Sequence, residues 1–253
     1  MIRIGIDIQG GDFAPEATTL GSILAYNEVK NDTRLVLIGD ENAIFNILKR
    51  ENFDPANFDI VHADEVIGMG EHPAKAFAKK KNSSIAIGFK MLAKGEIHGF
   101  ASAGSTGAML VGTMLTIRSV PGIIRPCITA SIPNVDGSNS LLLDVGINPD
   151  CRPDVLYQYA MLGSMYMENV YKIKDPKVGL LNIGSEEEKG NLLTKATHEL
   201  MKGSTDFNFV GNVEGSDFFS EGKADIIVSD GFTGNVVLKE AEAFYTLIRK
   251  MKL

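Results

Sequence analysis

Cysteine is scarce in this sequence, and long apolar runs are absent from it. The two cysteines, Cys127 and Cys151, have no short spacing between them, which fits a reducing cytosol and argues against a disulfide framework or a zinc cluster. No stretch approaches the roughly 18 apolar residues needed to span a bilayer. The first residues, MIRIGIDIQGGD, form a strand pattern without the long apolar core of a signal peptide. We therefore expect a cytoplasmic protein, with peripheral association with a membrane left open.

Positive charge is also in short supply. The chain has 25 Lys and Arg against 32 Asp and Glu, a net charge of −7, which disfavours a general nucleic-acid binder. Four of the lysines nevertheless lie close together, at Lys75, Lys79, Lys80 and Lys81. Pro73 suits the first turn of a helix, and this helix would place Lys75 and Lys79 one turn apart on one face. Such a face suits an acidic substrate or partner, although a solvated surface is the alternative.

Several familiar catalytic motifs are missing. The sequence contains no G-x-x-x-x-G-K-[ST] loop, no G-x-G-x-x-G fingerprint and no G-x-S-x-G elbow, so a P-loop nucleotidase, a Rossmann dinucleotide site and a serine hydrolase are unsupported. None of the four histidines has HExxH spacing, and we expect His98 and His198 to be solvated. Asp and Glu are plentiful, but no spacing demands a metal, so none is expected.

Short apolar runs alternate with helix-length amphipathic stretches along nearly the whole chain. These runs are rich in Val, Ile, Leu and Phe and end at Gly, Asn or Asp, which is typical of buried strands. They cover residues 2–8, 34–40, 58–63, 99–104, 140–146, 177–184, 207–212 and 224–231. Helical patterns lie between them, for example over 83–95 and 187–203, and each of these two ends at a glycine. The alternation predicts an α/β fold whose largely parallel sheet is flanked by helices on both faces.

Residues 122–144 break this rhythm. Two extended runs surround the turn PNVDGSN, which predicts a small antiparallel element. A chain of 253 residues fits one large domain or two closely packed ones. Because no Pro/Ser-rich linker or low-complexity tract marks a boundary, we expect a single α/β domain over residues 1–253.

Five of the expected strands end in small, polar, glycine-rich loops. Their sequences are IDIQGGD, SAGSTGA, LDVGIN, LNIGSEEEKGN and SDGFTGN, and two of them share the pattern G-x-T-G, in FASAGSTGAML (100–110) and SDGFTGNVVLK (229–239). Ligands of open parallel sheets gather at the carboxyl ends of the strands, and successive N–H groups before a helix form an anion nest. The loops therefore predict an oxyanion or phosphate site, with the paired loops as two walls of one pocket. The alternative for each single loop is that its glycines merely make a tight turn.

Taken together, these pieces resemble the bacterial phosphate acyltransferases of phospholipid synthesis, the PlsX family. The matching segments occur in order over essentially the whole chain: 6–16, 66–84, 102–108, 125–126, 141–148, 180–191, 209–217 and 230–239. One segment alone would be a weak signal, whereas eight in register are specific. The resemblance implies that inorganic phosphate attacks the thioester of a long-chain acyl carrier protein, giving an acyl phosphate and the free carrier. It also implies a three-layer fold like that of isocitrate and isopropylmalate dehydrogenases, a homodimer, and no redox cofactor.

Site residues follow from this resemblance. Phosphate is itself the nucleophile, so the expected protein contribution is positioning and electrostatic stabilisation. The expected phosphate nest consists of Ser102, Gly104, Ser105, Thr106 and Gly107, with Thr233, Gly234 and Asn235 as its second wall. Residues expected to orient the loops are Asp7, Gly10, Gly11, Asp12, Asp144 and Asn182. The catalytic candidates are His72, Asp230 and Asn148, of which His72 is expected to titrate unless it caps the helix beginning at Pro73. The four lysines would meet the acidic acyl carrier protein.

The sequence also departs from the family pattern. Ser105 stands where the loop usually has Asn, Ser185 and Glu188 alter the acidic loop after one strand, and the family continues past residue 253 with a further glycine-rich section. We therefore expect this chain to lack part of the family's site. The segment EAEAFYTLIRKMKL (240–253) ends basic and apolar, which suits either a dimer interface or a membrane surface. Two alternatives stay open: an enzyme acting on acyl-coenzyme A, and a non-catalytic scaffold for lipid synthesis.

Overall fold

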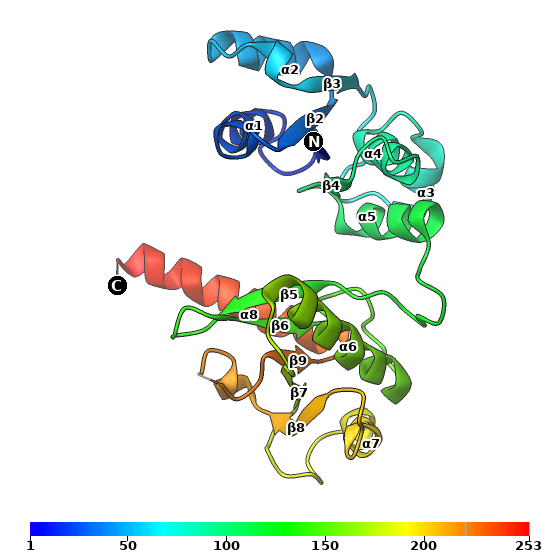
Figure 1. Cartoon of the computed structure of the whole chain (residues 1–253), viewed down its shortest axis with the longest axis vertical. Coiled ribbons are helices and arrows are strands. Elements are labelled where there is room, and N and C mark those ends of the chain that lie inside the picture. Colours follow the sequence, from blue (N-terminus) through cyan, green and yellow to red (C-terminus); the bar gives the residue numbers. More distant parts are fainter. Residues whose placement is uncertain (221, 253) are drawn as a thin grey trace. The chain divides into compact units, whose positions relative to one another are not determined.

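The computed structural model describes residues 1–220 and 222–252, which form two compact units (Figure 1). The first unit is Met1–Val120, and the second begins at Pro121. Each unit has its own sheet and its own covering helices. The single α/β domain expected over residues 1–253 stays a prediction.

The first unit is built on a four-stranded parallel sheet in the order β3-β2-β1-β4. Its elements are β1 (Ile2–Asp7), α1 (Glu16–Val29), β2 (Thr33–Gly39), α2 (Glu41–Arg50), η1 (Pro55–Asn57), β3 (Asp59–His62), α3 (Pro73–Lys79), α4 (Ser84–Ala93), β4 (Gly99–Ala101), α5 (Thr106–Gly112) and η2 (Thr113–Ile117). Parallel strands need crossover connections, and the helices supply them.

Alternation along β2 explains why both faces of this sheet are covered. Leu35 and Leu37 belong to a buried cluster that includes residues of α1 and α2, whereas Val36 and Ile38 belong to another that includes residues of α4. All four side chains are at most 5% exposed. Successive side chains of a strand point to opposite faces, so one continuous apolar run supplies two cores.

The second unit is built on a five-stranded sheet in the order β5-β6-β9-β7-β8, in which β5 and β6 are antiparallel and the other pairs parallel. Its elements are β5 (Thr129–Pro133), β6 (Asn139–Leu143), α6 (Pro153–Tyr166), η3 (Met167–Tyr171), β7 (Lys177–Leu181), α7 (Leu192–Met201), β8 (Asn208–Val213), η4 (Gly215–Asp217), β9 (Ile226–Val228) and α8 (Gly231–Met251).

The core of the second unit also lies on both faces of its sheet. Leu141 and Leu143 of β6 pack in a cluster with residues of α6 and α7, whereas Leu142 between them packs in a cluster with residues of α8. The sheet therefore holds the start of α8 on one face and the start of α6 on the other. The carboxyl ends of β6, β7 and β9 are placed beside these helices.

The expected α/β class, the parallel pairing and the antiparallel element are confirmed, while several predicted details are wrong. The helix expected over 187–203 begins only at Leu192, because Gly190 has a φ of +99° and Asn191 caps the helix. The Asn191 carboxamide oxygen accepts the Thr194 N–H at 2.9 Å. His198 was expected to be solvated but is only 3% exposed, whereas His98 is exposed. None of the helices in the described residues is long and apolar enough to cross a membrane.

Candidate active site

In the first unit, the loops after β1 and β4 meet in a tight polar contact. The Ser102 hydroxyl donates to Asp7 Oδ2 at 2.6 Å and accepts the Gly104 N–H at 3.0 Å. Asp7 is 1% exposed, and its other oxygen accepts the Gln9 N–H at 3.0 Å. A Cβ at Gly10 would lie 2.5 Å from Asp7 Oδ2 and 2.7 Å from the Gly104 nitrogen, so the close approach of the two loops requires glycine there.

Ser105 lies at the start of α5 and serves as its cap. It is 5% exposed, and its hydroxyl accepts the Ala108 N–H at 3.3 Å. The next two residues, Thr106 and Gly107, occupy the first turn of α5, where N–H groups have no acceptor within the helix. These two N–H groups are therefore the donors that this loop can offer to an anion.

The turn at His72 packs against the same loop. A Cβ at Gly107 would lie 2.5 Å from Pro73 Cγ, so α3 and α5 begin side by side. His72 is exposed and makes no side-chain cap for α3, which makes the capping alternative wrong.

Gly11 and Asp12, which were also expected to orient the loops, do not hold them through side-chain hydrogen bonds as Asp7 does. Gly11 has a φ of +105°, and Asp12 is exposed without a side-chain hydrogen bond among the described residues.

The four lysines near α3 are not equivalent. Lys80 Nζ pairs with Glu71 and donates to the Val66 carbonyl at 2.6 Å. The Lys80 ammonium and the Gly68 N–H together lower the pKa of Glu71. Lys81 Nζ lies 5.8 Å from the centre of the Phe77 ring. Lys75, Lys79 and Lys81 are exposed and form no ion pair within residues 1–220 and 222–252, so their charges are available to a partner.

In the second unit, the carboxylate of Asp144 holds the loop after β6. Asp144 is fully buried, and Oδ1 accepts N–H groups of Ile128 at 3.3 Å, Gly146 at 3.1 Å and Ile147 at 3.2 Å. Its Oδ2 accepts the Asn148 N–H at 2.8 Å and the Asn148 side-chain amide at 2.9 Å. A buried carboxylate is tolerated when its lone pairs are hydrogen-bonded in this way. Through these hydrogen bonds, the Asp144 carboxylate fixes the orientation of the loop after β6.

Asn148 is engaged inside the protein. Its side chain is 9% exposed, and Nδ2 also lies 2.7 Å from the Pro126 carbonyl and 2.7 Å from the Tyr159 hydroxyl. These contacts direct the amide toward the core. The geometry therefore supports a structural role, and the predicted catalytic role of Asn148 remains a prediction.

Two cysteines and a tyrosine near this loop were not among the site residues predicted from the sequence. Burial raises the pKa of Cys127 to about 12, with the Asp144 charge as the second cause. The same two causes raise the pKa of Cys151. Burial also raises the pKa of Tyr159. A thiol with so high a pKa stays protonated near neutral pH and makes a poor nucleophile.

The start of α8 packs directly on the loop held by Asp144. A Cβ at Gly234 would lie 1.9 Å from the Asp144 carbonyl oxygen, and one at Gly146 would lie 2.6 Å from Asn235 Nδ2. Asn235 Nδ2 donates to the Val145 carbonyl at 3.2 Å. Asp230 caps the helix, accepting the Thr233 N–H at 2.9 Å and the Thr233 hydroxyl at 2.8 Å. Both donors of Thr233 thus hold the Asp230 carboxylate in place.

A cavity of about 510 Å³ in the second unit brings together three of the predicted residues, Asn182, Asp230 and Thr233. Its remaining lining residues are Leu156, Leu180, Leu181, Ile183, Gly190, Asn191, Thr194, Gly215, Ser229 and Val237. Asn182 follows β7, and its side chain accepts the Ile183 N–H at 2.9 Å and donates to the Lys189 carbonyl at 3.1 Å. The cavity thus lies at the carboxyl ends of β7 and β9, the usual place for ligands of such sheets.

Asn191, Thr194 and Ser229 were missed by sequence reasoning. An Asn three residues before a Thr, just after a glycine, is an N-cap signal that could have placed the first two at a helix start. A smaller cavity of about 370 Å³ in the first unit is lined by Asp7 and Ser102, among others. The predicted set thus divides between the two units.

The sequence of this chain is similar to one family model and to known proteins. Residues 2–252 match a family model described as "Fatty acid synthesis protein". A phosphate acyltransferase of Dictyoglomus thermophilum is 46% identical over 95% of this chain and 71% of its own length. One from Syntrophomonas wolfei is 42% identical over 98% of this chain and 77% of its own length.

Among solved structures, the EutD phosphotransacetylase from Staphylococcus aureus has a TM-score of 0.66 at 16% identity, covering 97% of this chain and 82% of its own. A branched-chain phosphotransacylase from Enterococcus faecalis has a TM-score of 0.61 at 17% identity, over 96% of this chain and 85% of its own. At such identities the likeness shows a shared fold.

Proposed function

The chain belongs to the fatty acid synthesis protein family, and we propose that it transfers a long-chain acyl group from an acyl carrier protein to inorganic phosphate. Its relatives are named phosphate acyltransferases, and this chain is accordingly a transferase of that kind. The carrier protein, the length of the acyl chain and the residues that act are the proposed part.

The proposed reaction needs no covalent enzyme intermediate. A phosphate oxygen attacks the thioester carbonyl carbon, a C–O bond forms and the C–S bond breaks. The hydrogen phosphate proton ends on the departing thiolate, so the products are an acyl phosphate and the free thiol of the carrier. Cys127, whose pKa is raised to about 12, is unsuited to act as a nucleophile, which supports direct attack by phosphate.

Asp230 is the residue we propose for moving that proton. The observation that carries the proposal is the cavity of about 510 Å³, which Asp230 lines together with Asn182 and Thr233. The carboxylate is held by the Thr233 N–H and hydroxyl. A fixed carboxylate can accept the proton of an attacking phosphate and return it to the leaving group.

Phosphate binding is the role we propose for the glycine-rich loops. The first-turn N–H groups of Thr106 and Gly107 have no acceptor within α5, and successive N–H groups of this kind suit a phosphate oxygen. Ser102 and Gly104 hold that loop against Asp7. His72, which directly precedes the neighbouring helix α3, is proposed as a catalytic residue beside it.

An apolar groove supports a long acyl chain as the transferred group. The groove has a volume of about 770 Å³ and lies among β5, η4 and α8, lined by side chains such as Ile132, Phe218 and Phe244. It shares Gly215 and Val237 with the polar cavity, so the two adjoin. A substrate with a polar reacting end and an apolar tail matches this pair of spaces.

Lys75 and Lys79 are proposed to meet the acyl carrier protein. Both are exposed charges on α3, and complementary charge chiefly raises the association rate with an acidic partner. We also propose a homodimer, and peripheral membrane contact through residues 240–253. Exposed Phe244, Tyr245 and Met251 on α8 support an apolar contact, while Leu253 lies outside the described residues.

The proposed function is tested by mixing the protein with inorganic phosphate and a palmitoyl thioester of acyl carrier protein. We expect phosphate-dependent release of free carrier and an acyl phosphate that hydroxylamine traps as a hydroxamate. Parallel reactions use acetyl and palmitoyl thioesters of coenzyme A in place of the acyl carrier protein thioester. Faster turnover of acetyl-coenzyme A than of any carrier thioester would favour the acyl-coenzyme A alternative. No phosphate-dependent release from any thioester would contradict the proposed transfer and favour the scaffold.

A further inference from the structure

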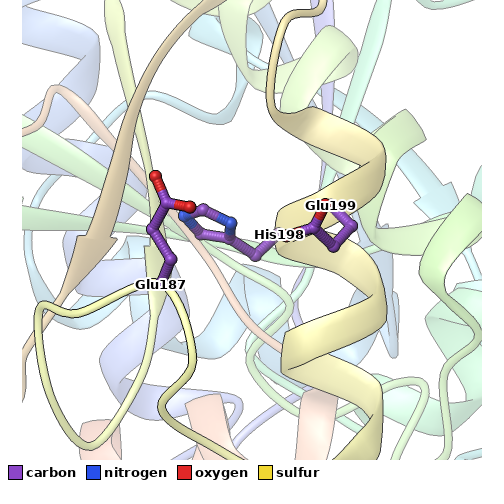
Figure 2. Close-up of side chains that lie close together, drawn as sticks. All are labelled: Glu187, His198 and Glu199. Atoms are coloured by element: carbon purple, nitrogen blue, oxygen red, sulfur yellow. The ribbon is translucent and has the colours of Figure 1, made fainter.

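Three potential metal ligands gather on the second unit. Glu187 lies in the loop between β7 and α7, and His198 and Glu199 lie on α7 (Figure 2). One ligand atom from each lies within 4.8 Å of the others. Figure 2 shows the His198 ring directed toward the Glu187 carboxylate.

His198 supplies an independent sign that a ligand belongs here. The side chain is 3% exposed, and its Nδ1 is buried without a hydrogen-bond partner in the described residues. The ring packs edge-on against Phe209, with centroids 5.2 Å apart. Buried polar atoms are nearly always hydrogen-bonded, and an imidazole whose proton is on Nε2 offers the lone pair of Nδ1 to a metal ion.

The cluster already attracts positive charge. Lys202 Nζ pairs with Glu187 Oε2, and this contact lowers the pKa of Glu187. The Lys202 side chain is 51% exposed, so its ammonium can move into water at little cost. A divalent cation would replace a single charge by a double one beside two carboxylates.

We propose that Glu187, His198 and Glu199 bind a divalent transition-metal ion, Zn²⁺ being the ion that suits these donors. One imidazole nitrogen and two carboxylate oxygens are ligands that zinc accepts, with water completing the tetrahedron. Bonds of about 2.0 to 2.2 Å to zinc require the ligand atoms to draw closer than they stand. The two glutamates are exposed, so rotation of their side chains supplies that movement.

Such an ion would brace the loop that lines the polar cavity. Ile183, Gly190 and Asn191 of this loop and Thr194 of α7 all line that cavity. An ion joining Glu187 to α7 would fix the loop against the helix. The site is independent of the proposed acyl transfer, because its residues are outside the set proposed to act on substrate.

Titration calorimetry of the metal-stripped protein with ZnCl₂ at pH 7.5 tests this site. We expect one site per chain, and at least about tenfold weaker binding in Glu187→Gln and in Glu199→Gln, since each removes one of three ligands. His198→Gln tests the imidazole. Should that buried substitution fail to fold, the two glutamate variants decide the matter alone.

Lys202→Met provides a test in the opposite direction. Removing the competing ammonium should tighten zinc binding by about threefold or more. Lys195→Met is the matched control, because Lys195 is exposed on α7 and its side chain makes no hydrogen bond or ion pair in the described part of the chain. Absence of zinc binding would overturn the proposal. So would equal affinity in wild type and both glutamate variants, or equal responses to Lys202→Met and Lys195→Met. A response to MgCl₂ as strong as to ZnCl₂ would also overturn it, because a hard cation gains little from an imidazole.

Discussion

Gly234, in the first turn of α8, lies against the backbone carbonyl of Asp144, where a Cβ would stand only 1.9 Å from the oxygen. The contact joins the helix that carries Asp230 to the loop that the Asp144 carboxylate holds. Because both partners are backbone, neither can give way by a change of rotamer.

Gly234→Ala should therefore displace α8 from its loop and destabilise the protein by about 1 to 3 kcal/mol, the usual range for an overpacked site. Urea denaturation followed by circular dichroism measures the change. Gly21→Ala is the matched control, since a Cβ at this α1 position meets nothing within 4 Å and alanine favours a helix by about 1 kcal/mol. Equal stability of the two variants would refute the tight contact.

Asp230→Asn separates proton transfer from helix capping. Asn is a good N-cap, so the melting temperature should change little, whereas kcat should fall about 10²-fold or more if Asp230 moves the proton. Asp230→Ala should lose both activity and stability. A kcat near that of wild type in Asp230→Asn would remove Asp230 from the proposed mechanism.

Ser105→Ala should lower stability by about 1 kcal/mol, because the Ser105 hydroxyl caps α5. Ser105→Asn restores the residue expected from the family pattern and keeps a capping oxygen, so stability should recover. Thermal denaturation of the three proteins measures both effects. Wild-type stability in Ser105→Ala would show that the cap contributes nothing.

Reversing Lys75 and Lys79 to Glu should slow association with acyl carrier protein by about tenfold at low ionic strength. The effect should shrink as added salt screens the charges. Stopped-flow binding measures the rate. The control reverses Lys90, an exposed lysine on α4. A rate that is unchanged, or that Lys90→Glu alters equally, would contradict a specific docking face.

The stability of the protein at alkaline pH should report the raised pKa of the Cys127 thiol. Its pKa is raised to about 12 from an unfolded value of about 8.5, so the folded protein holds this proton more tightly than the unfolded chain does. The contribution to stability is complete below pH ~8.5 and declines as pH rises from there toward 12. Urea denaturation at pH 8 and 10.5 should show a smaller loss of stability for Cys127→Ala than for wild type. Equal losses would argue against the raised pKa.

The chain's local patterns predicted much of the fold. Apolar runs such as 34–40 are local signals, and alternation along β2 supplies both faces of the sheet. Boundaries were less predictable, because the bend at Gly190 ends the acidic loop and delays α7 to Leu192. The burial of His198 was also missed, since helical spacing alone does not show which face another strand will cover.

Residue order and chemistry by themselves determined the α/β class, the family and the polar loops at strand ends, because these depend on periodicity and short motifs. Only the tertiary structure showed that Asn182, Asp230 and Thr233 line one cavity. It also showed that Lys80 is committed to Glu71, and that Glu187 and His198 meet. Such meetings join residues far apart in the chain, and they depend on how strands and helices pack, which no local pattern encodes.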